Sequence, residues 1–240
     1  MGHCHLIFNS IFPGIIPGGQ DGKGEGMSQA GQVDSSEFQY SAEWINKLET
    51  VEHWQQYWKQ ISFFQKVLSE NDTVLEIGVG SGFTASYLRS MGFTVTTLDI
   101  DESKNPGIVQ NIALDPIAGQ YHVVSAFEVL EHIPEKYLPA ILRNIHATGA
   151  KYFLLSLPEY FPTFIRFEGR LPIIKDFSIR IKRPKFLPNP ILTKHHHWEV
   201  NSSKSVATDQ LKQQFQQAGF KVLEAELFMD KHFFILKRID

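Results

Sequence analysis

The sequence predicts an α/β fold in which a doubly wound, mostly parallel sheet carries helices on both faces. Short runs rich in β-branched and aromatic residues alternate with amphipathic segments from residue 73 onward, and this alternation is typical of βαβ units. A glycine-rich turn joins the first of these strands to the next helix. The last two strands follow each other with no helix between them, so they predict an antiparallel edge.

Composition fits one globular domain and excludes several classes of protein. Of the 240 residues, 42% are hydrophobic and 20% are charged, which is ordinary for a domain with its own core. The net charge of −3 argues against a general nucleic-acid binder, which needs a basic surface. Cys4 is the only cysteine, so an internal disulfide is excluded and a cytoplasmic location is expected. No run approaches the roughly 18 apolar residues that span a bilayer.

The first part of the chain predicts a flexible leader followed by a long helix. Residues 1–40 are rich in Gly, Pro, Gln and Ser, and we expect the folded domain to occupy residues 41–240. Residues 41–70 have a helical pattern with a break near Thr50. Its apolar side chains recur at spacings of three and four, which predicts one face packed on the sheet: Trp54, Trp58, Ile61, Phe64 and Leu68.

The later elements follow from their local patterns. Helices are expected at 83–91, 139–148 and 209–218, and each is followed by a glycine suited to a left-handed cap. Strands are expected at six β-rich runs: 73–77, 93–98, 120–126, 151–157, 221–228 and 232–237. Residues 160–200 are rich in proline and have no clean period, so they predict an insertion over the sheet after the strand at 151–157.

The strongest chemical signal is the glycine turn that follows the strand at 73–77. Gly78, Gly80 and Gly82 let the backbone bend sharply and let a ligand approach the peptide N–H groups. The helix that follows offers unpaired N–H groups and a partial positive charge to a ligand carboxylate or phosphate. Asp99 ends the next strand, 21 residues after Gly78, where a carboxylate can accept hydrogen bonds from ribose hydroxyls. The two features together predict an adenosine-containing ligand.

Two motifs resemble one family. The glycines form G-x-G-x-G, without the G-x-G-x-x-G of dinucleotide folds, and Glu76 stands two places before the first glycine. Residues 123–133 read VVSAFEVLEHI. In this order the motifs resemble the class I S-adenosylmethionine-dependent methyltransferases. The resemblance covers residues 70–160 well, and implies a Rossmann-like sheet of seven strands with an antiparallel last strand and S-adenosyl-L-methionine as cofactor.

The resemblance also implies residues that bind the cofactor. The glycine turn would hold the methionine part, and Asp99 would hold the ribose. Asn111 would contact the adenine amino group through its side-chain carbonyl, with Asp115 as the alternative register. The full set that the resemblance implies is Glu76, Gly78, Gly80, Ser81, Gly82, Asp99, Ile100, Asn111, Ile112 and Phe127.

The insertion predicts the acceptor side of the site. Ligands of open α/β sheets bind beyond the carboxyl ends of the strands, where the 160–200 segment lies. One reading is a lid for an acidic or amphipathic acceptor, or a patch that touches an anionic surface. The other reading is a solvated cap on the domain. Both rest on the excess of basic residues, which are Arg166, Arg170, Lys175, Arg180, Lys182, Arg183 and Lys185, against Glu168 and Asp176.

Methyl transfer from a sulfonium needs few catalytic groups from the protein. A sulfonium makes its methyl group electrophilic, so the enzyme mainly aligns the acceptor and excludes water, and a general base is needed only for a protonated acceptor. The candidates for catalysis are His132, His197 and Glu199. In an extended strand only His195 and His197 of the histidine run would share a face, and no further ligand is fixed by spacing, so no metal site is predicted.

We therefore expect methyl transfer to a small-molecule or lipid-like acceptor. Residues 156–159 read SLPE, which is not the Asn-Pro-Pro-aromatic signature of enzymes that methylate amino groups of DNA, so no nucleic-acid acceptor is expected. Two alternatives stay open. The first is a nicotinamide-dependent oxidoreductase, which the glycine spacing disfavours. The second is a non-catalytic binding module on the same fold, which no residue pattern excludes.

Overall fold

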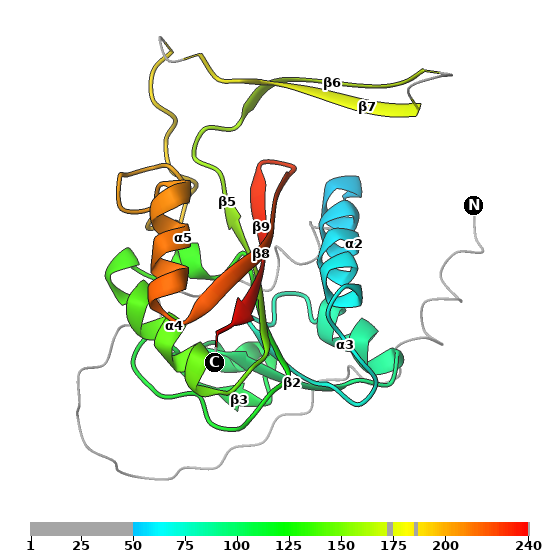
Figure 1. Cartoon of the computed structure of the whole chain (residues 1–240), viewed down its shortest axis with the longest axis vertical. Helices are drawn as coiled ribbons and strands as arrows, with labels where there is room; N and C mark the ends of the chain where they lie inside the picture. The colour runs from blue at the N-terminus through cyan, green and yellow to red at the C-terminus, as the bar shows by residue number, and fades with distance from the viewer. Residues whose placement is uncertain (1–49, 172–174, 185–186, 240) are drawn as a thin grey trace. The chain divides into compact units, whose positions relative to one another are not determined.

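The computed structural model describes residues 50–171, 175–184 and 187–239. The expected leader, residues 1–40, therefore lies outside the described part, so the expected domain boundary at residue 41 stays a prediction. Figure 1 shows the arrangement of the elements. In chain order they are α2 (Val51–Gln65), β1 (Thr73–Ile77), α3 (Phe83–Ser90), β2 (Thr94–Asp99), η3 (Glu102–Lys104), β3 (Ile108–Val109), β4 (Val123–Phe127), η4 (Leu130–His132), η5 (Glu135–Tyr137), α4 (Leu138–Ala147), β5 (Tyr152–Pro158), β6 (Thr163–Leu171), β7 (Lys175–Lys182), α5 (Thr208–Gln217), β8 (Phe220–Phe228) and β9 (Lys231–Arg238).

The main sheet has seven strands in the order β3-β2-β1-β4-β5-β9-β8. Strands β1 to β5 pair in parallel, and β9 runs antiparallel to both β5 and β8. This confirms the predicted fold class, including the antiparallel last strand. The strand order reverses at β1, which pairs with β2 on one side and with β4 on the other. Open α/β sheets bind their ligands beside such a reversal.

Helices cover both faces of the sheet, as Figure 1 shows. One core cluster joins the sheet to α4 and α5 through residues such as Ile141, Leu142 and Phe215. The other cluster joins it to α2 and α3 through residues such as Phe63, Phe64 and Leu88. Because both faces are covered, the central strands are mostly apolar, and the side chains of β5 from Phe153 to Pro158 are all buried.

The helix α2 differs from the expected stripe. It begins after Thr50, whose hydroxyl accepts a hydrogen bond from the His53 N–H. Ile61 and Phe64 are buried as predicted, but Trp54 and Trp58 are 45% and 64% exposed. Only the second half of α2 contributes buried residues to the core cluster that includes the sheet. The prediction of core packing was therefore wrong for the two tryptophans, whose half of the helix extends beyond that core.

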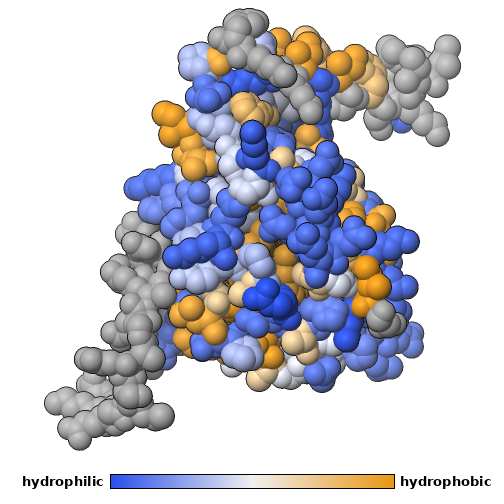
Figure 2. Space-filling model, turned by 60° about the vertical axis from the view of Figure 1, so that its left-hand side comes forward, coloured by the Kyte–Doolittle hydropathy of each residue, from blue (hydrophilic) through white to orange (hydrophobic). Residues whose placement is uncertain are grey.

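The insertion contains a β-hairpin that was not predicted from the sequence. Strands β6 and β7 pair antiparallel as a separate two-stranded sheet. Ile165 faces Ile181, and Phe167 faces Ile179 across the pair, and all four side chains are exposed. Hydrophobic surface gathers at the upper end of the molecule in Figure 2, where Figure 1 shows this hairpin. The Arg180 guanidinium ties it to β8 by donating to the Leu227 carbonyl oxygen at 2.7 Å.

Within the described residues, no helix is both long enough and apolar enough to span a membrane. The longest of them, α2, has 15 residues and a mixed polar and apolar sequence, whereas a spanning helix needs about 20 apolar residues.

We expect one substitution in β9 to lower the stability of the fold strongly. Phe234 is fully buried, and its ring centroid lies 5.4 Å from that of Phe215 on α5. We expect Phe234→Ala to lower the free energy of unfolding by about 3–5 kcal/mol because the cavity cannot fully collapse. Urea unfolding measures this. The control Ile191→Ala, at a position 94% exposed, should change stability by less than about 0.5 kcal/mol, and equal effects would contradict the packing described here.

Candidate functional site

The glycine turn between β1 and α3 adopts the conformation that glycine favours. Gly78, Gly80 and Gly82 have φ angles of 81°, 53° and 72°, which L-residues with a Cβ rarely adopt. A Cβ on Gly78 would lie 2.4 Å from Cγ2 of Val129, so no side chain fits there. A Cβ on Gly80 would meet no atom within 4 Å. The turn is therefore closely packed at its first glycine and open at its second.

A cavity of about 480 Å³ lies beside this turn. Its walls come from six places: one face of α2, the segment from the end of β1 to the start of α3, the segment from Phe127 to His132, the loop that contains Thr193 and His196, and the single residues Pro158 of β5 and Lys231 of β9. Segments far apart in the sequence thus meet at the carboxyl ends of β1 and β4. This is the edge at which an open α/β sheet binds its ligands.

The structure divides the predicted cofactor residues into two groups. Five of them line the cavity: Glu76, Gly78, Gly80, Ser81 and Phe127. The other five do not line it: Gly82, Asp99, Ile100, Asn111 and Ile112. Gly82 still serves the turn, because its carbonyl oxygen accepts the first hydrogen bond of α3 from the Ser86 N–H.

Asp99, the last residue of β2, contacts the backbone of the glycine turn. Its Oδ2 accepts a hydrogen bond from the Val79 N–H at 2.8 Å, and its Oδ1 accepts one from the Asp101 N–H at 3.0 Å. The Lys104 ammonium lies 3.3 Å from the same carboxylate. The sequence predicts that Asp99 and the turn lie close together, and in the structure a hydrogen bond joins them directly. In this structure the buried carboxylate holds the backbone of the turn.

Asn111 and Ile112 make local contacts. The Asn111 Oδ1 accepts a hydrogen bond from the Ala113 N–H at 3.0 Å, which closes a turn within the same loop. Ile112 is 4% exposed and belongs to the core on the α4 side. Neither side chain faces the cavity as the structure stands, so the contact with adenine stays a prediction.

Glu76 is the most unusual carboxyl group of the turn. Its side chain is buried on β1, it lines the cavity, and its Oε2 has no hydrogen-bond partner among the described residues. Burial raises the pKa of Glu76 to about 8, because a charge is poorly solvated there. A ligand that brings a positive group to this carboxylate would replace the missing solvation.

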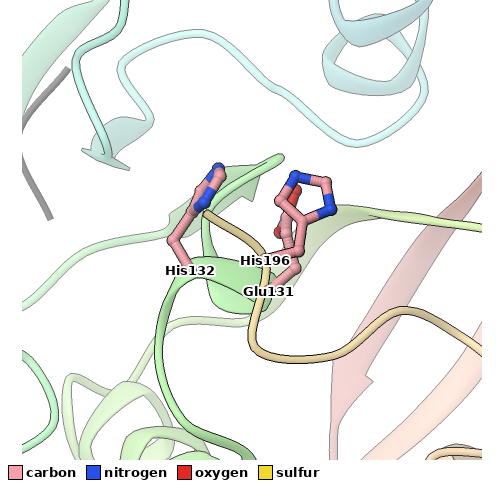
Figure 3. A group of neighbouring side chains, drawn as sticks. All are labelled: Glu131, His132 and His196. Carbon is pink, nitrogen blue, oxygen red and sulfur yellow. The ribbon is translucent and has the colours of Figure 1, made fainter. Parts of the chain in front are cut away.

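At another wall of the cavity, three side chains come together. Glu131 and His132 stand on η4, and His196 belongs to the loop before Val200. One carboxylate oxygen and one ring nitrogen from each histidine all lie within 4.8 Å of one another. Figure 3 shows the three side chains directed toward one space. The sequence indicated His132 but missed Glu131 and His196.

The prediction for the histidine run was wrong because the run is a turn. His195 has a φ of 73°, so the alternation of an extended strand does not apply. His196 turns toward the cavity, whereas the His197 side chain is exposed and does not line it. Glu199 is buried behind His196, and its Oε1 accepts hydrogen bonds from the Thr193 N–H at 2.9 Å and from His196 Nδ1 at 2.7 Å.

Hydrogen bonds set the tautomers of the two histidines that line the cavity. His132 Nδ1 lies 3.0 Å from the His195 carbonyl oxygen, which can only accept, so Nδ1 carries the proton. His196 Nδ1 donates to Glu199 in the same way. In its neutral form, each ring then carries its lone pair on Nε2. Burial lowers the pKa of His132 to about 4, so this ring is neutral at pH 7.

Two charged side chains lie next to Glu131. The Glu128 carboxylate pairs with the Lys231 ammonium and accepts a hydrogen bond from the Ser156 hydroxyl at 2.8 Å. Burial raises the pKa of Glu131 well above its ordinary value, and the nearby Glu128 carboxylate raises it further. Burial alone would lower the pKa of Lys231, but the Glu128 carboxylate outweighs it and the pKa is raised.

Comparisons with known proteins find similar sequences and similar structures. The family model described as a methyltransferase domain matches residues 51–225. The ubiquinone biosynthesis O-methyltransferase of Pseudomonas paraeruginosa is 27% identical, over 52% of this chain and 71% of that protein. The structure of the glycopeptide N-methyltransferase MtfA complexed with S-adenosyl-L-methionine is similar at a TM-score of 0.51 and 14% identity, over 76% of this chain and 93% of that one. A methyltransferase from Clostridium acetobutylicum is similar at a TM-score of 0.50 and 10% identity, over 82% and 95%.

The raised pKa of Glu76 predicts a pH dependence of stability. Between its unfolded value of 4.5 and its folded value of about 8, the folded state holds a proton that the unfolded state has lost. Stability contributed by this group therefore falls as the pH rises, by about 1.4 kcal/mol per pH unit. We expect Glu76→Gln to remove this contribution from the slope, as measured by urea unfolding of the protein without ligand between about pH 5.5 and about pH 7.5.

A matched control for this experiment is Glu102→Gln, since Glu102 is exposed on η3. The control should keep the slope of the original protein. The interpretation of Glu76 fails if the Glu76→Gln variant and the control lose stability with pH at the same rate.

Proposed function

The chain belongs to the methyltransferase-domain family, the class I S-adenosylmethionine-dependent methyltransferases, and from this premise we propose that it transfers the methyl group to an oxygen of a small-molecule acceptor. The family model covers residues 51–225, most of the chain. One observation carries the proposal. The cavity beside the glycine turn is also lined by a polar wall, defined as the carboxyl group of Glu131 and the imidazole rings of His132 and His196.

The glycine turn fits the amino-acid end of S-adenosyl-L-methionine. Gly80 opens onto space that no protein atom fills within 4 Å of an added Cβ, so a ligand can approach the backbone there. Glu76 offers an unpartnered carboxylate oxygen in the same wall, suited to the ammonium group of the methionine part. These two residues would hold the cofactor, and Asp99 supports them by holding the Val79 N–H.

When bound, the cofactor supplies a methyl group that its sulfonium already makes electrophilic. The residues of the chain then have three tasks: to hold the donor at the turn, to place the acceptor in line with the methyl–sulfur bond, and to exclude water. Alignment of this kind accounts for a large part of the rate of such bimolecular reactions. The aromatic side chains of Tyr57, Phe83 and Phe127, which line the cavity, supply walls that exclude water.

The polar wall supports an oxygen nucleophile. In the transfer, a lone pair of the acceptor oxygen forms the new bond to the methyl carbon, and the pair of the broken bond stays on sulfur as a neutral thioether. The acceptor also gives up a proton, which one of the side chains of this wall, Glu131, His132 or His196, would receive. The relative from Pseudomonas paraeruginosa carries the name of an O-methyltransferase, which favours oxygen over nitrogen.

The insertion supports a role on the acceptor side. Pro158 at its start and Thr193, Lys194 and His196 near its end line the cavity, whereas no described residue of the hairpin β6–β7 does. We infer that the loop that follows the hairpin forms part of the acceptor pocket. The basic and apolar hairpin would then make a contact outside the pocket. Both interpretations of the insertion, as a lid and as a solvated cap, stay predictions.

Two matched glycine substitutions test the cofactor site. Gly80 and Gly92 both have positive φ, and an added Cβ at either position meets no atom of the described residues within 4 Å, so valine strains the backbone at both positions. Only Gly80 lines the cavity. We expect Gly80→Val to weaken the binding of S-adenosylhomocysteine at least about tenfold, equal to about 1.4 kcal/mol, and Gly92→Val to leave it within about twofold. Isothermal titration calorimetry measures both.

The same titration separates the rival functions. Heat of binding with S-adenosylhomocysteine and none with NADH supports the methyltransferase. Binding of NADH alone would favour the oxidoreductase. Binding of S-adenosylhomocysteine with no transfer of labelled methyl from S-adenosyl-L-methionine to any hydroxylated compound in a metabolite extract would favour the non-catalytic module. Equal affinities for Gly80→Val and Gly92→Val would place the cofactor elsewhere.

A further inference from the structure

The cluster on the polar wall has the composition of a metal site. We propose that Glu131, His132 and His196 bind one divalent transition-metal cation, whose remaining coordination positions face the cavity. The three ligand atoms lie within 4.8 Å of one another. Two ligands of one tetrahedral ion, each at about 2.0–2.2 Å from it, are about 3.4 Å apart, so the side chains need to close by at most about 1.4 Å.

Glu131 supplies the first argument. Its side chain is fully buried, yet neither of its carboxylate oxygens has a hydrogen-bond partner among the described residues. A carboxylate in that position is costly unless it is paired or coordinates a metal. The side chain also lines the cavity, beside two histidines. A cation at the centre of the cluster would bind this carboxylate directly.

The two histidines supply the second argument. In each ring the Nδ1–H is already committed, in His132 to the His195 carbonyl oxygen and in His196 to the Glu199 carboxylate. Ligating histidines in proteins almost always donate their other ring N–H to a carbonyl or a carboxylate in this way, which fixes the ring and makes the ligating nitrogen more basic. Both supporting partners lie within the same loop as His196.

The neighbouring carboxylates supply the third argument. Two carboxylates flank the cluster, and each already has partners: Glu128 pairs with Lys231, and Glu199 accepts hydrogen bonds from the Thr193 N–H and from His196. The carboxyl group of Glu131 has no such partner among the described residues. A divalent cation bound to Glu131 would supply it.

The ligand set indicates the class of metal. Imidazole nitrogens with one carboxylate suit Zn²⁺, Fe²⁺, Co²⁺ and their neighbours, whereas Mg²⁺ prefers oxygen ligands. Three protein ligands leave room for a further one from solvent or substrate. This part of the inference rests on the proposed function: an acceptor hydroxyl bound to the ion would lose its proton to water more easily, and would then face the methyl donor as the oxygen anion.

A rival explanation needs no metal. His196 and Glu199 form a pair like the imidazole and carboxylate of a general-base system, in which the carboxylate orients the ring and stabilises its protonated form. In that case Glu131 would be a protonated neighbour, and no cation would bind. The two explanations differ in what they predict for the metal-free full-length protein in the absence of both cofactor and acceptor.

The test is direct metal binding. The full-length protein is stripped with a chelator and titrated with Zn²⁺ in competition with a chromophoric chelator, then with Co²⁺ while its visible absorption is followed. We expect one ion per chain, binding of Mg²⁺ at least about tenfold weaker, and losses of at least about tenfold in Zn²⁺ affinity for Glu131→Gln and for His196→Gln. The control is His195→Asn, in the same turn, because asparagine tolerates its positive φ and keeps the carbonyl that His132 uses.

Each result decides the proposal. One Zn²⁺ per chain that is lost in Glu131→Gln and His196→Gln, and kept in His195→Asn, supports it. No stoichiometric Zn²⁺ or Co²⁺ binding, or binding that survives both substitutions, overturns it. Circular dichroism and S-adenosylhomocysteine affinity, measured on the same samples, show whether each variant is folded. Because cofactor binding is measured separately, failure of the metal site and failure of the proposed methyl transfer give different results.

Discussion

The rest of the structure depends on the close contact between the backbone of Gly78 and the side chain of Val129. A Cβ at Gly78 would approach Val129 to 2.4 Å, so the end of β1 can bend there only because the residue is glycine. The bend is then held from β2 as well: the Gly78 N–H donates to the Leu98 carbonyl oxygen and the Val79 N–H donates to Asp99. This arrangement directs the turn toward the carboxyl ends of β1 and β4, where it forms one wall of the cavity.

A second constraint completes the cavity from far along the chain. The Trp198 indole is buried and donates to the Ile133 carbonyl oxygen at 2.9 Å, and the His197 N–H donates to the Glu131 carbonyl oxygen at 2.8 Å. These contacts bind the loop that follows the hairpin to η4. They bring His196 within reach of Glu131 and His132. The local backbone at the histidine run, with the positive φ of His195, decides which of the three histidines faces the cavity.

Much of the fold could be predicted because its signals are local. Strands and helices showed their own periodicity, and the glycine turn indicated the edge of the sheet at which the cavity lies. The predictions that were wrong concern residues whose surroundings are set by contacts distant in the sequence. Trp54 and Trp58 share the helical stripe of Ile61 and Phe64, but only the latter two reach the core. The hairpin was missed because the prolines that flank its strands drew attention away from a short alternation in β7, that of Phe177, Ile179 and Ile181. His196 was missed because no single-sequence pattern distinguishes a turn from a strand there. Asn111 accepts a hydrogen bond within its own loop, and its contact with adenine stays a prediction.

The central claim is that the bend at Gly78 and the cluster around Glu131 border one reaction space. A crystal structure of the protein with S-adenosylhomocysteine tests it most directly. We expect the amino-acid end of the ligand against Gly78, Gly80 and Glu76, with its sulfur directed toward Glu131 and His196 across the cavity described above. A ligand bound away from this turn, or a sulfur directed away from that cluster, would contradict the claim.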